Sequence, residues 1–268
     1  MIRITFPLRR KQDLSFEEFQ SYWLDQHGPL VASVAKQLNI VRYVQVHTIT
    51  DPDEAQTEGQ RGRMQKPYDG VAELWFESLE TLKQDSGNGT GKEDVIASGA
   101  ALLEDERKFI DLAQSPGWVS YECPQINPTP ENLVASPESN LIKLYYLLNH
   151  PQDQSFDDVQ RYWRVQHGPL VRQYGPALQI QRYIQVHRLE DEFNAGFAKS
   201  RGCLVPPYFG HAELWYEQQT PGETSTKATQ APEAREGAQA LYEDEARFID
   251  FSRSALWFGK EHVIVDWH

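Results

Sequence analysis

The sequence predicts an α+β fold in which two copies of one β-α-β-β-α-β unit pack together as a single intramolecular barrel. Three observations predict this fold. The chain repeats itself at an offset of 140 residues, each copy carries the same order of strand and helix patterns, and a segment containing four prolines separates the copies. Because solenoid repeats have periods of only about 20–50 residues, each copy should be a domain-sized unit.

The repeat is strong enough to set the domain boundaries. Of the 33 positions in residues 15–47, 18 are identical to their counterparts in residues 155–187. Residues 67–77 match 207–217 at the same offset, and late in each copy the offset falls to 139. We therefore predict a first unit over residues 1–123, a linker over 124–139 and a second unit over 140–268.

The first strand and first helix of each unit have clear local signals. Residues 2–8 and 141–148 have strand composition. A capping box, Ser15 with Glu18, precedes an apolar stripe that begins at Phe16, and this pattern predicts a helix. Gly28 and Pro29 interrupt the stripe, so we expect a kink or a restart there.

The later elements complete a ferredoxin-like unit. Residues 40–47 and 71–76 are rich in strand-forming residues, and the polar segment between them predicts a long loop. A second helix is expected over residues 95–112 and a last strand from Trp118. One such unit leaves a sheet face uncovered, so the duplication should supply the second sheet, as in a dimeric α/β-barrel.

Composition limits the classes of partner. The chain has 268 residues, 40% of them apolar, and a formal net charge of -13. This acidic balance argues against nucleic acid and anionic membrane surfaces as partners. No apolar stretch approaches the roughly 20 residues that span a bilayer, so we expect a soluble, cytoplasmic protein that acts on a small molecule.

A family resemblance rests on a set of short motifs. They are Tyr22-Trp23, His27-Gly28-Pro29-Leu30-Val31, Arg42-Tyr43, Tyr68-Asp69-Gly70-x-Ala72-Glu73-Leu74-Trp75 and Asp105-x-x-x-Phe109. Together they resemble the EthD domain family of dimeric α+β barrels. The resemblance implies an internal pseudo-dimer, leaves a further homodimer open, and points to metabolism of small organic compounds. It implies no single activity, because related barrels include isomerases, cyclases, cofactor-free monooxygenases and haem enzymes.

Two residue pairs are candidates for acid–base chemistry. His27 and Asp105 each lie on the apolar face of a predicted helix, and His167 and Asp244 repeat this arrangement. A carboxylate that accepts from one imidazole nitrogen leaves the other nitrogen to take up or release a proton. A purely structural pair would give the same pattern. Asp69 offers a further carboxylate in the first copy only, so if a single site is active, we expect it to be the first.

Further polar and aromatic residues are expected to bind substrate. They are Tyr22, Trp23, Tyr43, Gln45, His47, Tyr68 and Trp75 in the first copy, and Tyr162, Trp163, Tyr183, Gln185, His187 and Tyr208 in the second. Strand alternation places Tyr43, Gln45 and His47 on one face. An ion pair between Arg42 and Glu73 is expected, and Glu104 and Glu106 are expected to be solvated.

The leading functional hypothesis is a cofactor-independent lyase, dehydratase or isomerase acting on a small oxygenated or aromatic compound. A non-catalytic binding protein of an oxidative pathway and a haem-binding barrel stay open as alternatives. No metal is expected, because the histidines lack the i, i+4 helix spacing of familiar sites.

Overall fold

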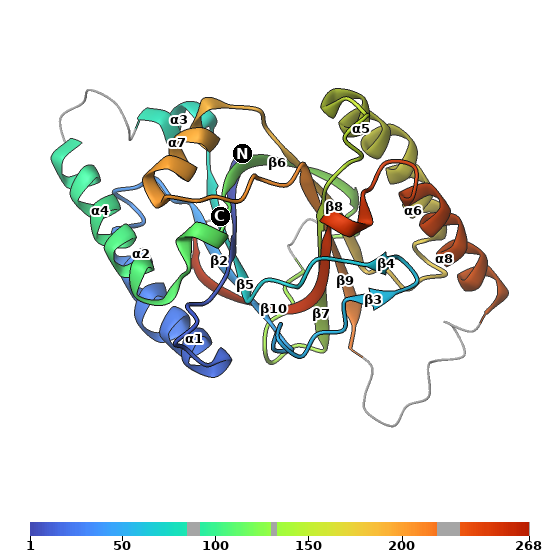
Figure 1. Cartoon of the computed structure of the whole chain (residues 1–268), viewed down its shortest axis with the longest axis horizontal. Coiled ribbons are helices and arrows are strands. Elements are labelled where there is room, and N and C mark those ends of the chain that lie inside the picture. Colours follow the sequence, from blue (N-terminus) through green and yellow to red (C-terminus); the bar gives the residue numbers. More distant parts are fainter. Residues whose placement is uncertain (85–91, 130–132, 219–230, 268) are drawn as a thin grey trace.

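The computed structural model describes residues 1–84, 92–129, 133–218 and 231–267. Eight antiparallel strands close into one barrel in the order β1-β5-β2-β10-β7-β9-β8-β6, with helices packed outside it at two opposite ends of the long axis (Figure 1). The pairs β2–β10 and β6–β8 join the two halves. The predicted intramolecular barrel is therefore confirmed.

The first half follows the predicted order of elements. Its elements are β1 (Ile2–Leu8), α1 (Phe16–Tyr22), the π-helix η1 (Trp23–His27), α2 (Gly28–Val34), β2 (Arg42–Thr48), β3 (Glu58–Gly59), β4 (Gly62–Arg63), β5 (Gly70–Phe76), α3 (Leu79–Gln84), α4 (Lys92–Phe109), the 3₁₀ turn η2 (Leu112–Gln114) and β6 (Trp118–Ile126). The hairpin β3–β4 lies inside the segment that was expected to be a loop.

Within its described residues, the second half repeats this order with one helix in place of the hairpin β3–β4, and the counterpart of α3 falls outside those residues. Its elements are β7 (Leu141–Leu148), α5 (Phe156–Tyr162), η3 (Trp163–His167), α6 (Gly168–Tyr174), β8 (Arg182–Arg188), α7 (Glu192–Arg201), β9 (Gly210–Glu217), α8 (Pro232–Glu245), η4 (Phe251–Arg253) and β10 (Ala255–Asp266). Helix α7 stands where the first half has the hairpin β3–β4.

The first helix of each half begins as the sequence predicts and continues through a π-turn. Ser15 accepts from the Glu18 amide, and the Glu18 side chain accepts from the Ser15 amide, which completes the capping box. The five-residue π-helix that ends at His27 precedes Gly28 and Pro29, so the predicted interruption is a change of helical winding and not a break. The backbone stays helical up to Val34, and the π-turn sets the direction of His27.

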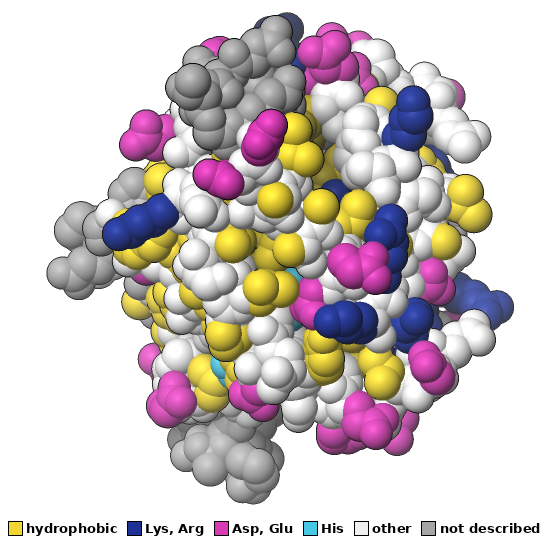
Figure 2. Space-filling view, turned by 90° about the vertical axis from the view of Figure 1, so that its left-hand side faces the viewer, with side chains coloured by type: hydrophobic (Ala, Val, Ile, Leu, Met, Phe, Trp, Pro, Cys, Tyr) yellow, Lys and Arg dark blue, Asp and Glu magenta, His cyan; other side chains and the backbone are white. Residues whose placement is uncertain are grey.

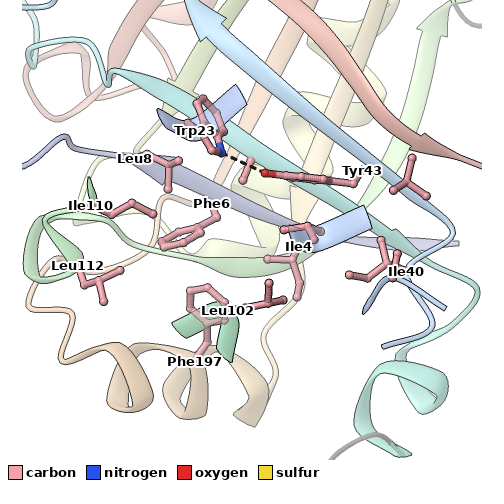
Figure 3. Packing of buried hydrophobic residues seen from close by; sticks show 14 of the residues in the cluster. Ile4, Phe6, Leu8, Trp23, Ile40, Tyr43, Leu102, Ile110, Leu112 and Phe197 are labelled. Atoms are coloured by element: carbon pink, nitrogen blue, oxygen red, sulfur yellow. Dashed lines mark hydrogen bonds between the residues drawn. The ribbon is translucent and has the colours of Figure 1, made fainter. Parts of the chain in front are cut away.

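Each strand of the barrel has one face toward the helices and one toward the barrel interior. Apolar residues of β1, η1, α4 and α7 form the core between sheet and helices in the first half (Figure 3). A separate apolar cluster, which includes Trp118, Trp257 and Tyr145, fills part of the interior. The two sides of the sheet are therefore distinct environments.

A buried ion network also occupies the interior. Glu73 pairs with Lys143 at 3.0 Å and with Arg3 at 3.5 Å, and Arg3 also binds Glu213. This arrangement corrects the expected pair of Arg42 with Glu73, because Arg42 instead pairs with Asp266 of β10 at 3.2 Å. The partner strand from the other half, which the repeat alone could not place, supplies that carboxylate.

Two segments cross the barrel to reach the opposite half. Helix α7 of the second half lies beside the helices of the first, whereas the hairpin β3–β4 of the first half reaches the helices of the second (Figure 1). Arg201 of α7 pairs with Glu106 of α4, and Arg61 of the hairpin pairs with Glu245 of α8. Within the described ranges, no helix combines the length and apolarity needed to cross a membrane.

Candidate functional site

Each half encloses a cavity between its helices and the outer face of its sheet. The first cavity has a volume of about 450 Å³ and the second about 350 Å³. Both volumes fall in the range of small-molecule sites. The surface over the first-half helices carries hydrophobic side chains across its middle, with charged side chains around them (Figure 2).

A histidine and a carboxylate meet at the first cavity. His27, at the end of η1, lines the cavity, and its Nδ1 lies 2.8 Å from Oδ2 of Asp105 on α4. Both side chains are less than one-tenth exposed. Within the described part of the chain, His27 makes its side-chain hydrogen bond through Nδ1 alone. Its Nε2 is therefore left for a ligand in the cavity.

The surroundings of Asp105 keep this carboxyl ionised. Burial would raise the pKa of Asp105, but hydrogen bonds from His27, Lys108 and Tyr22 hold it below its ordinary value. The Tyr22 hydroxyl donates to Oδ1 at 2.8 Å and the Lys108 ammonium lies 3.0 Å from the same atom. An ionised Asp105 can only accept, so His27 carries its proton on Nδ1 and presents the Nε2 lone pair.

Tyr43 supplies a hydroxyl proton to the same cavity. Its oxygen accepts from Trp23 Nε1 at 3.0 Å, a bond drawn in Figure 3, and from Gln45 Nε2 at 3.1 Å. Gln45 Nε2 also donates to the Trp23 carbonyl, which fixes the orientation of the amide. Because both neighbours donate, the Tyr43 hydroxyl proton stays available. Burial raises the pKa of Tyr43, so the group remains a donor.

The second half repeats the arrangement. His167 Nδ1 lies 2.8 Å from Asp244 Oδ2, and Tyr162 donates to Oδ1 of the same carboxylate at 2.5 Å. Tyr183 accepts from Trp163 Nε1 at 3.2 Å and from Gln185 Nε2 at 3.1 Å. His167, Trp163 and Tyr183 line the second cavity. Both halves thus carry the same constellation.

The cavities are completed by residues that the sequence patterns did not indicate. Arg201 contacts both oxygens of Glu106, at 2.8 and 2.9 Å, and both residues line the first cavity. Arg61 and Glu245 repeat this pair at the second. Glu106 is therefore not a solvated member of an acidic run. Only the repeat could have indicated its inward position, because Glu106 matches Glu245 and Arg201-Gly202 matches Arg61-Gly62.

Three residues expected to bind substrate lie elsewhere. Tyr68, Trp75 and Tyr208 belong to the cluster inside the barrel and do not line either cavity. Trp75 donates its indole proton to Glu122 at 2.8 Å. Trp75 pairs with Arg42, so alternation places it on the opposite side of the sheet from Tyr43. We do not retain these three as binding residues.

Gln45 and His47 lie behind Trp23 and support it. His47 stacks on the Trp23 ring at a centroid distance of 4.5 Å. Its Nε2 donates to the side-chain oxygen Oε1 of Gln45 at 2.9 Å. Gln185 and His187 form the corresponding support for Trp163. These four residues position the cavity wall without lining it.

Asp69 also lies away from the cavity. It is almost fully buried and binds the Arg10 guanidinium and, at 3.0 Å, the Arg10 amide. In the second half this pair is replaced by His150 and Phe209, whose rings lie 5.7 Å apart. The exchange of Asp69 for Phe209 therefore replaces an ion pair by a packing contact, and it lies outside the residues that line the second cavity.

One group of side chains has the composition of a metal site. Glu73, His211 and Glu213 can bring one ligand atom each within 4.8 Å of one another, inside the barrel. Arg3 and Lys143 already contact these carboxylates. A cation there would face two fixed positive charges, so the residues fit an internal ion network better than a metal centre.

Comparisons with known proteins agree with the barrel architecture. A family model described as the EthD domain matches residues 11–113 and 151–252. A dye-decolorizing peroxidase from Bacteroides thetaiotaomicron superposes with a TM-score of 0.51 at 9% identity, covering 96% of this chain and 92% of that one. A candidate monooxygenase from Fusobacterium nucleatum gives 0.47 at 7% identity, with 98% and 93% covered. No curated protein matches the sequence.

Proposed function

We propose that each half of this chain, which belongs to the EthD domain family, catalyses proton transfer on a small organic compound. The compound would be largely apolar and would carry a carbonyl or hydroxyl oxygen. The observation that carries the proposal is the 2.8 Å bond between Asp105 and Nδ1 of His27, a residue that lines the first cavity. The reaction class is that of a cofactor-independent lyase, dehydratase or isomerase.

The roles follow from which protons are held and which are free. His27 Nε2 would take a proton from a carbon next to the substrate carbonyl, while Asp105 stabilises the imidazolium that forms. Tyr43 would donate its hydroxyl hydrogen bond to the carbonyl oxygen as negative charge develops there. The enolate can then regain the proton at another carbon, or expel a β-hydroxyl group as water after that group takes the proton from His27.

Haem is a poorer fit to the cavity. His27 Nε2 would be the residue atom to bind a haem iron, but a haem also carries two carboxylates that need cationic partners. Arg201 is the single Lys or Arg among the described lining residues of the first cavity, and it already binds Glu106. An absorption spectrum of the purified protein tests this alternative, because bound haem gives an intense Soret band.

A non-catalytic binding protein would use the same cavity without the chemistry. Deuterium exchange distinguishes the two, because it needs no knowledge of the natural substrate. The bicyclic ketone 2-tetralone has exchangeable protons next to its carbonyl, and their replacement in D₂O can be followed by NMR. We expect the protein to accelerate exchange, and we expect His27→Asn combined with His167→Asn to abolish the acceleration.

A matched control separates chemistry from damage to the fold. Ser33→Ala lies on α2, the helix that follows His27, and Ser33 is exposed, so this variant should exchange 2-tetralone like the wild type. Exchange that survives in the double histidine variant, or no acceleration by the wild type, would contradict proton transfer. Saturable binding without exchange would favour the binding protein.

A further inference from the structure

The two cavities differ in a systematic way. At most lining positions the repeat places the same residue in both, including Trp23 and Trp163. Two phenylalanines of the first cavity are tyrosines in the second. Phe6 corresponds to Tyr146 and Phe76 to Tyr216, so the second cavity gains two phenol hydroxyls on the sheet side.

One of these hydroxyls has no partner. Tyr146 is only 4% exposed, and its hydroxyl oxygen makes no hydrogen bond of normal geometry with the described residues, although the Arg61 guanidinium lies close to it. The ring lines the cavity and lies near the Arg61 guanidinium, whose central carbon is 5.6 Å from the ring centroid. A buried hydroxyl without a partner costs free energy, so it indicates a group that arrives with a ligand or with ordered water.

The second hydroxyl lies in the same polar region. Tyr216 also lines the cavity, and burial, then Glu245, raise its pKa, while Arg61 opposes this. The same two charged residues act on Tyr146. Tyr146 and Tyr216 therefore line the same cavity as the pair that Arg61 forms with Glu245.

The segments that cover the two cavities also differ, and the first cavity has the more apolar cover. Phe193 and Phe197 of α7 cover the first cavity, and Phe197 packs on Phe6 with ring centroids 5.0 Å apart (Figure 3). Gln60 and Arg61, from the hairpin β3–β4, cover the second. Ser200 and Arg201 of α7 also line the first cavity, so polar groups occur in both covers and the difference is the two phenylalanine rings of the first.

We propose that the second cavity is a distinct binding site for an oxygenated aromatic ligand, such as a phenol or a hydroxylated ketone, whereas the first takes a ligand whose corresponding edge is apolar. The ligand oxygen would hydrogen-bond to the Tyr146 hydroxyl, and Tyr183 and His167 would meet a second oxygen. The proposal rests on the proposed function only in treating both cavities as ligand sites. Binding is measured here without turnover, so either proposal can fail alone.

Reciprocal substitutions test the assignment. Tyr146→Phe gives the second cavity the residue of the first, and Phe6→Tyr does the opposite. The probes are 2-naphthol and naphthalene, which differ by one hydroxyl group, and their binding is measured by equilibrium dialysis. Tyr146→Phe should weaken 2-naphthol binding about threefold to tenfold and leave naphthalene binding unchanged, as expected for one net hydrogen bond. Phe6→Tyr should strengthen 2-naphthol binding at the first cavity.

Filling each cavity in turn shows where the probe binds. Ala72 and Ala212 occupy equivalent positions in the two cavities. Ala212→Phe should remove the hydroxyl-dependent binding of 2-naphthol, and Ala72→Phe should retain it. The opposite result, or equal affinities of 2-naphthol for the wild type and for Tyr146→Phe, would overturn the proposal.

A measurement without ligand keeps the proposal falsifiable if a cavity-filling variant does not fold. Because the Tyr146 hydroxyl has no partner, its removal should leave the melting temperature unchanged or raise it. A lower melting temperature of Tyr146→Phe would indicate that the hydroxyl is paired within the protein, and this would overturn the proposal.

Discussion

Three buried histidines should make the folded protein sensitive to acid. His47, His187 and His211 are at most 5% exposed, and burial lowers the pKa of each from 6.5 to about 3. In the unfolded chain each takes up a proton near pH 6.5, whereas in the folded protein it stays neutral. Their contribution to stability is therefore complete above pH 6.5 and is lost as the pH falls toward 3.

The size of the effect follows from the number of protons. Between pH 6.5 and 3, each histidine changes the free energy of unfolding by about 1.4 kcal/mol per pH unit. The three together therefore change it by about 4 kcal/mol per pH unit. Glu73 acts in the opposite direction, because burial and the nearby Glu213 raise its pKa to about 8. Glu73 therefore adds about 1.4 kcal/mol per pH unit to the free energy of unfolding on acidification. The net loss in the free energy of unfolding is then about 3 kcal/mol per pH unit.

Urea unfolding at pH 7.0, 6.0, 5.5 and 5.0, followed by circular dichroism, measures this slope. His211→Val introduces the residue found at position 71 of the first half, and it should reduce the slope by about 1.4 kcal/mol per unit. Tyr145→Phe is the matched control, because Tyr145 contacts His211 at 2.8 Å but does not titrate in this range. A flat pH profile in the wild type, or equal slopes in wild type and His211→Val, would refute the reasoning.

Three further predictions concern the cavity cover, a close contact and the ion network. Arg201→Lys keeps the charge but loses the bidentate contact to Glu106, so amide hydrogen exchange in residues 192–201 should accelerate; unchanged exchange would contradict a role in closure. Gly70→Ala should destabilise the protein by about 1–3 kcal/mol in urea unfolding, because its Cβ would lie 2.8 Å from the Val46 carbonyl oxygen of β2 and would clash with a ring carbon of Trp23. Gly99→Ala, whose Cβ meets nothing within 4 Å, is the control and should stabilise helix α4 by about 0.5–1 kcal/mol. In the wild type, ionisation of Glu73 should lower the free energy of unfolding by about 1.4 kcal/mol per pH unit as the pH rises from 5 to 8. Glu73→Gln should remove this loss, and parallel stability profiles of wild type and variant would contradict the raised pKa.

The sequence predicts those parts of the site that depend on one helix or one strand. His27 and Asp105 are on apolar helical faces, and both helices pack on the same side of the sheet, so their proximity follows from periodicity. The common face of Tyr43 and Gln45 follows from alternation. These residues depend on local geometry that every copy of the unit shares.

Contacts between the halves could not be predicted in the same way. Both faces of a strand are buried in a closed barrel, so alternation separates Trp75 from Tyr43 without saying which of them faces the cavity. Arg201 reaches Glu106 from the other half, across 95 residues of sequence, and no local pattern indicates that approach. Asp69 was misassigned because its partner Arg10 follows a different strand.

The protonation of the His27 ring tests the central claim most directly. Nitrogen-15 NMR of histidine-labelled protein distinguishes the two neutral tautomers. If Asp105 orients His27 for proton transfer, Nδ1 carries the proton, Nε2 is unprotonated, and the Nε2 signal shifts when 2-tetralone enters the first cavity. A proton on Nε2 in the neutral ring, or an Nε2 signal that does not respond to the probe, would contradict the account.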